Sequence, residues 1–366
     1  MSRGTPDYRL LGAFLVLLTF GVLVLASASA VVGFERFSDA YYFLKRQLVF
    51  GVLPGLVIFF ILLRHDYRRL KPLAAPIFAL ALLLLILVLI PGIGTSFGGA
   101  RRWLVVGPFS FQPSEFMKLG LVIYLAAWLS RRPRQLTEGR QGLLPFAFIL
   151  GSAVGLIVLQ PDIGTATAVG LIGMGMYLVA GAPWRYLLIL SAAGLLLFFV
   201  LVTVKPHAAE RFTTFLHPEL DPQGVGYHIN QAYMAIGSGG WFGRGIGQSR
   251  AKFQYLPEVY GDSIFAVIGE ELGFVFSVTF IGLLMFIFYY GIKAARAAPD
   301  DFGRLLAGGV VIWFTSQTFV NISAMLGLLP LTGIPLPFVS YGSSALLMTL
   351  AGAGLLVAVS SQARAA

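Results

Sequence analysis

The sequence predicts an all-α, polytopic membrane protein with ten transmembrane helices and both termini in the cytoplasm. Two compositional observations support this fold class: only 11% of the 366 residues are charged and 57% are hydrophobic, whereas a soluble protein carries about 25% charged residues. A third observation is that apolar runs recur along the whole chain, several of them near the ~20 residues that a helix needs to cross a bilayer.

Ten apolar segments are separated by polar linkers. We expect a helix in each, because a chain in lipid must satisfy its own backbone hydrogen bonds. The first ten residues are largely polar and lead into a full-length apolar run, so we expect no cleaved signal peptide. Residues 1–366 are interpreted as a single membrane domain. The expected helices are residues 10–31, 44–63, 73–91, 113–130, 143–160, 163–181, 184–204, 263–290, 305–328 and 343–361.

The linkers rich in Lys and Arg predict the orientation of the chain. With a cytoplasmic N-terminus, more than half of the 26 Lys and Arg residues fall on the inner side, many of them in short basic linkers such as 64–71 and 131–140. This is the distribution that the positive-inside bias produces. The same orientation leaves residues of about 205–262, between the seventh and eighth helices, as one long extracytoplasmic segment, and loops of this length are usually functional.

The remaining basic residues lie on the outer side, against this bias. They include Arg102, Lys118, Arg211 and Lys252. Basic residues held there indicate an anionic ligand, although solvated loop charge or contact with phospholipid headgroups accounts equally well for any single one. The net charge of +10 is explained by anionic lipids and by the positive-inside bias, so we expect no nucleic-acid partner.

The long outer segment holds three further features. Ile229, Ala232, Tyr233 and Ile236 repeat at helical spacing, which predicts a short helix in the outer interface. The glycine-rich stretch 234–249 matches no nucleotide-binding spacing, and its glycines favour tight turns over a backbone site for a diphosphate. Histidines and acids permit a zinc site, but their spacing matches no known ligand signature, and the chain has no cysteine. These residues are His207, Glu210, His217, Glu219, Asp221 and His228.

Four acidic residues fall in the stretch 255–274, where the chain passes from polar to apolar sequence. Asp262 directly precedes the apolar run, so it is the natural N-cap of the eighth helix. Partly desolvated there, it would also have a raised pKa and could act as a general base. Glu270 and Glu271 lie deeper, where a carboxylate must face a cavity or a partner. We expect structural pairing roles for both, in separate environments because neighbouring side chains on a helix point about 100° apart.

Three further polar clusters are expected on the outer side. The first lies around the third and fourth helices and consists of Arg102, Gln112, Glu115 and Lys118. The second lies between the fifth and sixth helices and consists of Gln160 and Asp162. Glu115 and Lys118 are three residues apart, which favours a local ion pair. The third cluster, the proline-rich stretch 328–344, cannot be regular helix and must line protein or a water-filled cavity. We expect all of them to meet Asp262 in one outward-facing polar crevice.

Four motifs resemble the signatures of the SEDS family (shape, elongation, division and sporulation). They are "FQPSEFMKL" at 111–119, "QPDIGTA" at 160–166, "YLPE" followed by "DSIFAVIGEELGF" within 255–274, and "GLLPLTGIPLPFVSYGSS" at 327–344. The resemblance runs in order from residue 25 to the C-terminus. Two more stretches, "YYFLKRQL" at 41–48 and "AIGSGGWFGRGIGQS" at 235–249, resemble the FtsW branch of the family more than the RodA branch.

The resemblance implies a peptidoglycan glycosyltransferase of the bacterial cytoplasmic membrane. Its substrate would be lipid II, a disaccharide-pentapeptide on undecaprenyl diphosphate, polymerised into lipid-linked glycan at the outer face. The family's essential acid falls on Asp262. One departure is that Tyr260-Gly261 stands where the family usually has His-Thr, which affects the geometry expected of this loop. Other polar positions of the family fall on Arg102, Gln112, Glu115, Lys118, Gln160, Asp162 and Glu258.

The chemistry implied is transfer to the 4-hydroxyl of an acceptor sugar, with Asp262 as base and inversion at the donor's anomeric carbon. Arg102, Lys118, Arg211 and Lys252 would stabilise the diphosphate leaving group. Asp262 could also hold a divalent cation, Mg²⁺ or Mn²⁺. Family members work with a class B penicillin-binding protein and other membrane proteins of the divisome or elongasome. A lipid II flippase and a scaffold that only recruits a transpeptidase are the alternatives.

Overall fold

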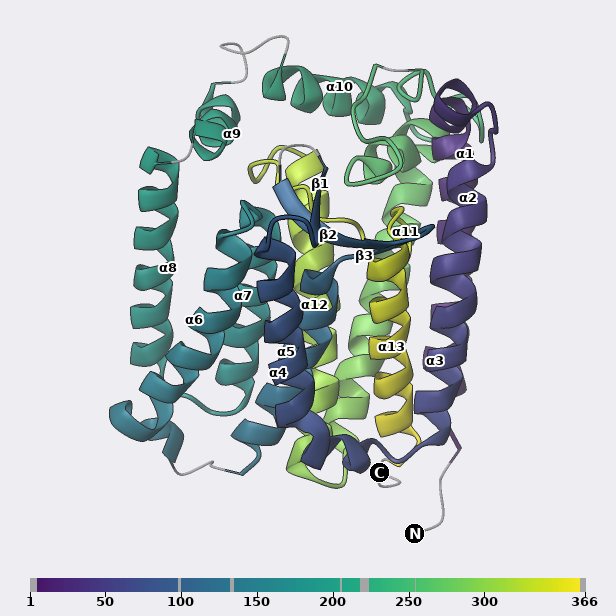
Figure 1. Ribbon diagram of the computed structural model, residues 1–366. Helices are drawn as coiled ribbons and strands as arrows, with labels where there is room; N and C mark the ends of the chain where they lie inside the picture. The colour runs from purple at the N-terminus through teal and green to yellow at the C-terminus, as the bar shows by residue number, and fades with distance from the viewer. Residues whose placement is uncertain are drawn as a thin grey trace.

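The computed structural model describes residues 5–97, 100–131, 135–204, 206–217, 224–253 and 255–362. It is a bundle of long helices, with two short helices, α9 and α10, lying across one end (Figure 1). A helix is present in each of the ten predicted apolar segments. The long helices are α1 (Tyr8–Phe37), α3 (Leu53–Arg64), α4 (Leu70–Leu89), α5 (Pro113–Leu129), α6 (Leu144–Val158), α7 (Ile163–Val179), α8 (Trp184–Val204), α11 (Ile264–Ala297), α12 (Asp301–Met325) and α13 (Ser343–Ser360).

Shorter helical pieces extend these runs or cover the end of the bundle. α2 and the π-helical η1 lead directly into α3, and 3₁₀ or π turns precede α4 and α6. α10 confirms the predicted short helix, whereas α9 was not predicted. These pieces are α2 (Tyr42–Gln47), η1 (Leu48–Val52), η2 (Tyr67–Arg69), η3 (Gln135–Thr137), η4 (Gly139–Leu143), α9 (Pro206–Leu216) and α10 (Val225–Ser238).

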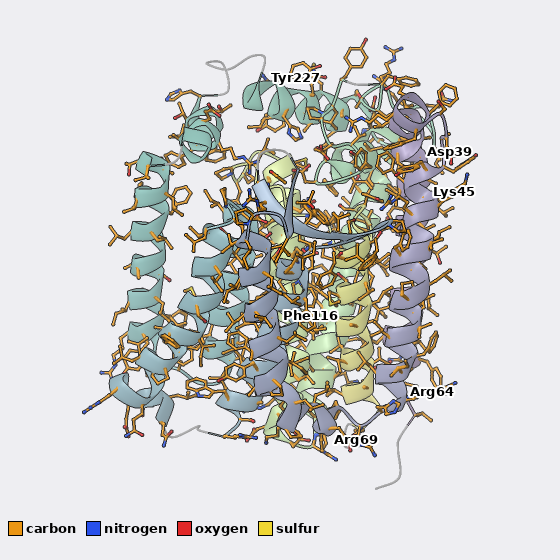
Figure 2. The ribbon with its side chains drawn as sticks, in the orientation of Figure 1. Asp39, Lys45, Arg64, Arg69, Phe116 and Tyr227 are labelled. Carbon is orange, nitrogen blue, oxygen red and sulfur yellow. The ribbon has the colours of Figure 1, made fainter. Side chains whose placement is uncertain are left out.

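The described helices are those of a multi-pass membrane protein. Eight helical runs are long and apolar enough to cross a bilayer, and α7 is a shorter apolar helix. α5 is equally short, at 17 residues, and carries two buried charges in its first turns. The start of α1 and the end of α13 lie together, since the Asp7 amide donates to the Ser360 hydroxyl over 3.4 Å. Figure 2 shows Arg64 and Arg69 at one end of the bundle and Tyr227 of α10 at the other.

The prediction of an all-α fold was wrong between α4 and α5. A three-stranded antiparallel sheet stands there, with β1 (Gly94–Phe97), β2 (Ala100–Val106) and β3 (Phe109–Phe111) in that order. Leu104 is central to it, because it pairs with Gly94 on one side and with Phe111 on the other. β2 is rich in β-branched and aromatic residues, which favour strands, and Gly107 supplies the positive φ of the turn into β3. The hydropathy pattern identified only a linker.

α12 and α13 form the centre of the bundle, while α8 stands at its edge. In an apolar stretch of 18 residues from each helix, 83% of the stretch is buried in α13 and 67% in α12, but only 6% in α8. Small residues permit the close packing at the centre. A Cβ added to Gly354 of α13, for example, would lie 2.9 Å from the Phe59 carbonyl oxygen of α3, the kind of backbone approach that glycine allows between membrane helices.

α11 is broken near its N-terminal end, and the preceding loop repairs the break. Gly273 has φ 78° and ψ −173°, so the helical hydrogen bonds on either side of it cannot form. The amides of Arg244 and Gly245 donate to the carbonyls of residues 270 and 271, over 3.0 and 2.9 Å. In return, the carbonyls of Gly240 and Trp241 accept from the amides of residues 274 and 275. Inserting this loop satisfies backbone groups that a kink in lipid would otherwise leave unpaired.

The same loop neutralises the two glutamates beside the break. Glu270 accepts from the Ser249 hydroxyl at 2.5 Å and from the amides of Arg250 and Ala251. Glu271 pairs with the Lys252 ammonium at 3.1 Å, and both of these side chains are at most 5% exposed. The predicted structural roles are confirmed by these contacts.

Separate environments for Glu270 and Glu271 were nevertheless the wrong expectation. Ser249 serves both, its hydroxyl contacting Glu270 and its amide contacting Glu271 over 3.4 Å. The 100° between neighbouring side chains is real, but the loop wraps far enough around the helix to reach both of them.

Replacing Gly273 with Ala should destabilise the protein by on the order of 1–3 kcal/mol. A Cβ at this position would lie 2.2 Å from the Gly243 amide nitrogen and would strain a positive φ. The measurement is the apparent melting temperature in detergent. Gly282→Ala is the matched control, because Gly282 lies in the same helix with no atom within 4 Å of an added Cβ; equal melting temperatures for the two variants would contradict the prediction.

Replacing Glu271 with Gln should also lower the melting temperature, by the equivalent of about 3–5 kcal/mol, because the buried Lys252 charge loses its counterion. The control is Asp301→Asn, which removes the exposed pair between Asp301 and Arg304 and should cost at most about 1 kcal/mol. Similar effects of the two substitutions would mean that the buried pair contributes no more than a surface pair.

Candidate active site

Asp262 lies in the turn that leads into α11, not at the N-cap predicted for it. α11 begins at Ile264, and Ser263 holds the N-cap position without a capping hydrogen bond from its side chain. The reason is a tight turn that begins at Glu258, whose φ of 49° is left-handed. Its carbonyl accepts from the amides of Gly261 and Ser263, over 2.8 and 3.4 Å. This turn delays the helix by one residue and leaves the Asp262 carboxylate half-buried before it.

The proline-rich segment between α12 and α13, residues 326–342, packs against this turn. The Asn321 amide group of α12 donates to the Asp262 and Ile334 carbonyls, each over 2.8 Å. The Ser340 hydroxyl donates to the Gly261 carbonyl over 2.6 Å. The predicted absence of regular helix in 328–344 is confirmed up to residue 342, whereas Ser343 and Ser344 already belong to α13. Contacts within the protein pair parts of this irregular backbone, such as the Ile334 carbonyl and the Leu336 amide.

Gly333 brings the same segment next to the carboxylate. It has a φ of 69°, and a Cβ built on it would lie 3.9 Å from Asp262 Oδ2. Any side chain here would therefore enter the space beside that oxygen.

Desolvation dominates the electrostatics of this carboxylate. It raises the pKa of Asp262 to about 6, while the nearby Arg211 guanidinium acts in the opposite direction. The pKa of Glu258 is also raised, first by desolvation and then by the negative charge of Asp262. A carboxyl group ordinarily titrates near pH 4. Asp262 is thus suited to accept a proton near neutral pH, as a general base must.

Arg211 reaches this site from α9. Its guanidinium donates to the Leu331 carbonyl of the proline-rich segment over 3.3 Å, and its charge acts on Asp262. The structure therefore brings three of the predicted site residues together: Asp262, Glu258 and Arg211.

Tyr260 and Gly261, which replace the His-Thr expected from the family resemblance, help to hold the turn. The Tyr260 ring stacks on Phe43 of α2 with centroids 4.4 Å apart, and its edge meets Tyr341 at 5.8 Å. The Tyr341 amide also donates to the Tyr260 carbonyl over 2.7 Å. An aromatic cluster from three segments thus fixes the turn.

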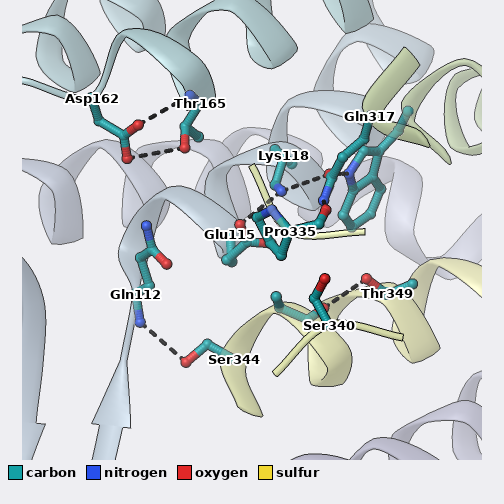
Figure 3. A network of polar contacts seen from close by, with 12 residues as sticks. Gln112, Glu115, Lys118, Asp162, Thr165, Gln317, Pro335, Ser340, Ser344 and Thr349 are labelled. Atoms are coloured by element: carbon teal, nitrogen blue, oxygen red, sulfur yellow. Dashed lines mark hydrogen bonds and ion pairs between the residues drawn. The ribbon is translucent and has the colours of Figure 1, made fainter. Parts of the chain in front are cut away.

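The predicted ion pair between Glu115 and Lys118 is confirmed, and it is fully buried. Their charged atoms are 2.7 Å apart, with side chains at most 2% exposed. Lys118 also donates to Gln317 Oε1 of α12, and the Gln317 amide group donates to the Pro335 carbonyl, each over 2.8 Å. Figure 3 shows this chain of contacts from α5 through α12 to the proline-rich segment. Lys118 is therefore neutralised by the protein itself.

The other predicted site residues make contacts that hold neighbouring helices, strands and loops together. Arg102 of β2 pairs with Asp162 at 3.3 Å, and Asp162 caps α7 by accepting from the Thr165 amide at 3.1 Å (Figure 3). The Gln160 amide group donates to the Leu85 carbonyl of α4 over 3.1 Å. The backbone N–H of Gln112 donates to the Ser344 hydroxyl at the start of α13. Lys252 pairs with Glu271 at the helix break.

Several residues that hold the site were not singled out from the sequence. Asn321 and Gln317 lie inside the apolar stretch of α12, and buried amides in a membrane helix are a recognisable signal. His228 was considered only as a zinc ligand, yet its Nε2 lies 2.6 Å from the Ser263 hydroxyl. Among the described residues, no three His, Asp or Glu side chains group as a metal site would need. Glu219, Asp221 and the His207 side chain lie outside the described residues.

Comparison with known proteins identifies the family. The family model described as cell cycle protein, covering FtsW, RodA and SpoVE, matches residues 8–365. The chain is 41% identical to stage V sporulation protein E of Bacillus subtilis over 99% of both chains. It is 39% identical to the probable peptidoglycan glycosyltransferase FtsW of Trichlorobacter lovleyi, over 97% of this chain and 93% of that one.

Solved structures show the same likeness along nearly the whole chain. One is a chain from a peptidoglycan synthase complex, with a TM-score of 0.81 at 34% identity, covering 97% of this chain and 98% of that one. Another is the rod shape determining protein RodA of Thermus thermophilus, with a TM-score of 0.72 at 32% identity over 97% of both chains. The chain therefore belongs to the SEDS family of FtsW, RodA and SpoVE.

Proposed function

We propose that this protein is a peptidoglycan glycosyltransferase that polymerises lipid II, with Asp262 as the general base. The observation that carries the proposal is a desolvated carboxylate whose pKa is raised to about 6. The positively charged Arg211 side chain acts on this carboxylate. The chain also belongs to a family in which relatives are named as probable peptidoglycan glycosyltransferases. Within the family, the FtsW-like stretches at 41–48 and 235–249 favour a role in division-type synthesis.

The proposed reaction transfers the growing glycan from its lipid diphosphate to the 4-hydroxyl of an acceptor sugar. Asp262 removes the hydroxyl proton as the oxygen attacks the anomeric carbon. The bond from that carbon to the diphosphate oxygen breaks, its electron pair leaves with the lipid diphosphate, and the configuration inverts. The base contributes typically 10²–10⁴-fold to such a reaction.

Arg211 and Arg102 are the cations that we assign to the leaving diphosphate. Lys118 and Lys252 are buried and already paired with Glu115 and Glu271, so their positive charges are largely neutralised within the protein. Arg211 acts directly on Asp262. Arg102 is also paired, with Asp162, but its side chain is 28% exposed, and its buried Nε has no hydrogen-bond partner among the described residues. Cations placed where charge develops stabilise the transition state.

Asp262 and Glu258 also fit a divalent cation. The two carboxylates are close enough for the charge of Asp262 to raise the pKa of Glu258, and Mg²⁺ at phosphate sites is usually held by one or two carboxylates together with the substrate phosphates. As the alternative to the base role of Asp262, we propose these two residues as the protein ligands of Mg²⁺ or Mn²⁺. Such an ion would supply charge neutralisation at the diphosphate.

The proposed setting is the bacterial cytoplasmic membrane, crossed ten times, with both termini inside and α9, α10 and Asp262 at the outer face. Support comes from Arg64 and Arg69, which lie at the opposite end of the bundle (Figure 2), and from the adjacent ends of α1 and α13. One structural relative belongs to a peptidoglycan synthase complex described as coordinating polymerization and crosslinking. We therefore propose a class B penicillin-binding protein as partner, together with other division or elongation proteins.

Asp262→Asn should abolish polymerisation of lipid II by the purified protein with its class B partner, because the amide cannot accept the proton. The expected loss is about 10²-fold or more, read as glycan length and rate on gels. Asp301→Asn is the control, since that carboxylate is 59% exposed at the opposite end of the bundle.

Three outcomes separate the candidate functions. Equal polymer from wild type and Asp262→Asn would remove Asp262 as the base. No polymer from either, with lipid II crossing the bilayer of a vesicle, would indicate a flippase. No polymer and no crossing, with increased transpeptidase activity of the partner, would indicate a scaffold.

The rate of polymerisation should rise with pH through about 6 and then level off. Asp262 works as a base only when deprotonated, and burial raises its pKa to about 6, so each pH unit below that value should cost up to about tenfold in rate. Arg211→Gln should move this limb to higher pH, because the guanidinium holds the pKa of Asp262 down. A flat profile between pH 5 and 8, about the range where such a base titrates, would contradict the assignment.

A further inference from the structure

The hydroxyl of Ser263 is a junction of three contacts beside the proposed base. It is fully buried and lies 2.6 Å from His228 Nε2, 2.8 Å from the Pro257 carbonyl oxygen and 3.4 Å from Asp262 Oδ1. These partners come from α10, from the start of the turn and from its end. One side chain thus connects the covering helix to the segment that presents the carboxylate.

The chemistry of the three contacts settles which atom donates. A hydroxyl has one proton, and both the Pro257 carbonyl and the Asp262 carboxylate can only accept. The Ser263 proton therefore serves these oxygens, and His228 must donate from Nε2 to the hydroxyl oxygen. A neutral ring with its proton on Nε2 meets this requirement. Burial lowers the pKa of His228 to about 4, with Arg211 acting in the same direction and Glu258 opposing it, so the ring is neutral at physiological pH.

His228 stands on a helix that is rigidly attached to α11. Ile229, Ala232 and Ala235 of α10 are buried. At the end of α10, Ile236 packs so closely on Gly269 that a Cβ added to this glycine would lie 3.1 Å from it. The His228 side chain therefore reaches the turn from a fixed position.

The turn itself needs outside support. It contains a non-glycine residue, Glu258, at a φ of 49°, and such a conformation persists only when surrounding contacts hold it. The aromatic cluster around Tyr260 holds the middle of the turn, and the Ser263 junction holds its end. The position of the carboxylate thus depends on that junction.

We propose that His228 is a positioning residue for glycosyl transfer: by donating to the Ser263 hydroxyl, it fixes the turn that aims the Asp262 carboxylate at the acceptor hydroxyl. This inference rests on the proposed function. It assigns His228 no contact with substrate and no proton transfer. Misplacing a catalytic group by about 1 Å can cost 10²-fold in rate, so a contact one residue away from the base is sufficient to matter.

The test compares kcat and KM for lipid II polymerisation among full-length variants assayed with the class B partner. His228→Leu removes the donor and should lower kcat by about 10- to 100-fold with KM unchanged. His228→Gln should restore most of kcat, because its amide Nε2 is a neutral donor of similar reach. Asn230→Ala, an exposed neighbour on α10, is the matched control and should behave as wild type.

A double-mutant cycle shows whether His228 acts through Ser263. Ser263→Ala should lower kcat by a similar factor, and the double variant with His228→Leu should lose little more, because both substitutions remove the same link. Independent, multiplicative losses would overturn the inference, and so would wild-type kcat in His228→Leu or a raised KM with kcat intact. If His228→Leu fails to fold, as judged by its melting temperature, Ser263→Ala and His228→Gln decide: similar kcat values for these two overturn it.

The same assays separate this inference from the function on which it rests. Wild-type protein that makes no glycan with its partner would overturn both. Active wild type, inactive Asp262→Asn and fully active His228→Leu would leave the function standing and remove only the positioning role.

Discussion

The site depends on one constraint: every backbone group freed within the membrane must find a partner in the protein. The break at Gly273 leaves carbonyls and amides of α11 without partners in the helix, and the loop of residues 240–245 forms hydrogen bonds with them. That loop continues from α10, so satisfying the break also fixes α10 against α11. The turn that carries Asp262 then lies between this repaired region and the proline-rich segment, which is itself irregular backbone held by Asn321 and Gln317. The same contacts thus pair the backbone and position the proposed base.

A second consequence of burial is that most charges near the site are already balanced. In the sequence, Lys118 and Lys252 resemble Arg102 and Arg211, because all four were predicted for the outer face, yet each lysine is paired with a buried glutamate. Leaving such a charge unpaired in a low-dielectric interior would be costly. The proposed base differs because the cation that acts on it, Arg211, belongs to a separate helix and lowers the raised pKa only in part. Glu115 and Glu271 differ from it because each is paired directly with a lysine.

Much of the fold and some of the site could be predicted from residue patterns. Ten apolar segments marked ten helices, helical spacing marked α10, a three-residue spacing marked the pair of Glu115 and Lys118, and the proline run marked a segment without regular helix. The errors have local physical causes. β-strands in a short linker leave no hydropathy signal, so the sheet between α4 and α5 was missed. The left-handed turn at Glu258 shifts the helix start by one residue, which displaced Asp262 from the N-cap predicted for it.

The sequence by itself determined that this is a multi-pass membrane protein, which family it resembles and which acid is the candidate base. Those conclusions depend on composition, periodicity and motif order, and these are properties of the chain read along its length. Only the tertiary structure decided that Glu271 neutralises Lys252, that one loop serves both Glu270 and Glu271, and that His228 lies against Ser263. These contacts join residues that are far apart in the chain. They depend on where the broken helix finds hydrogen-bond partners for its backbone, and no local sequence pattern encodes that three-dimensional requirement.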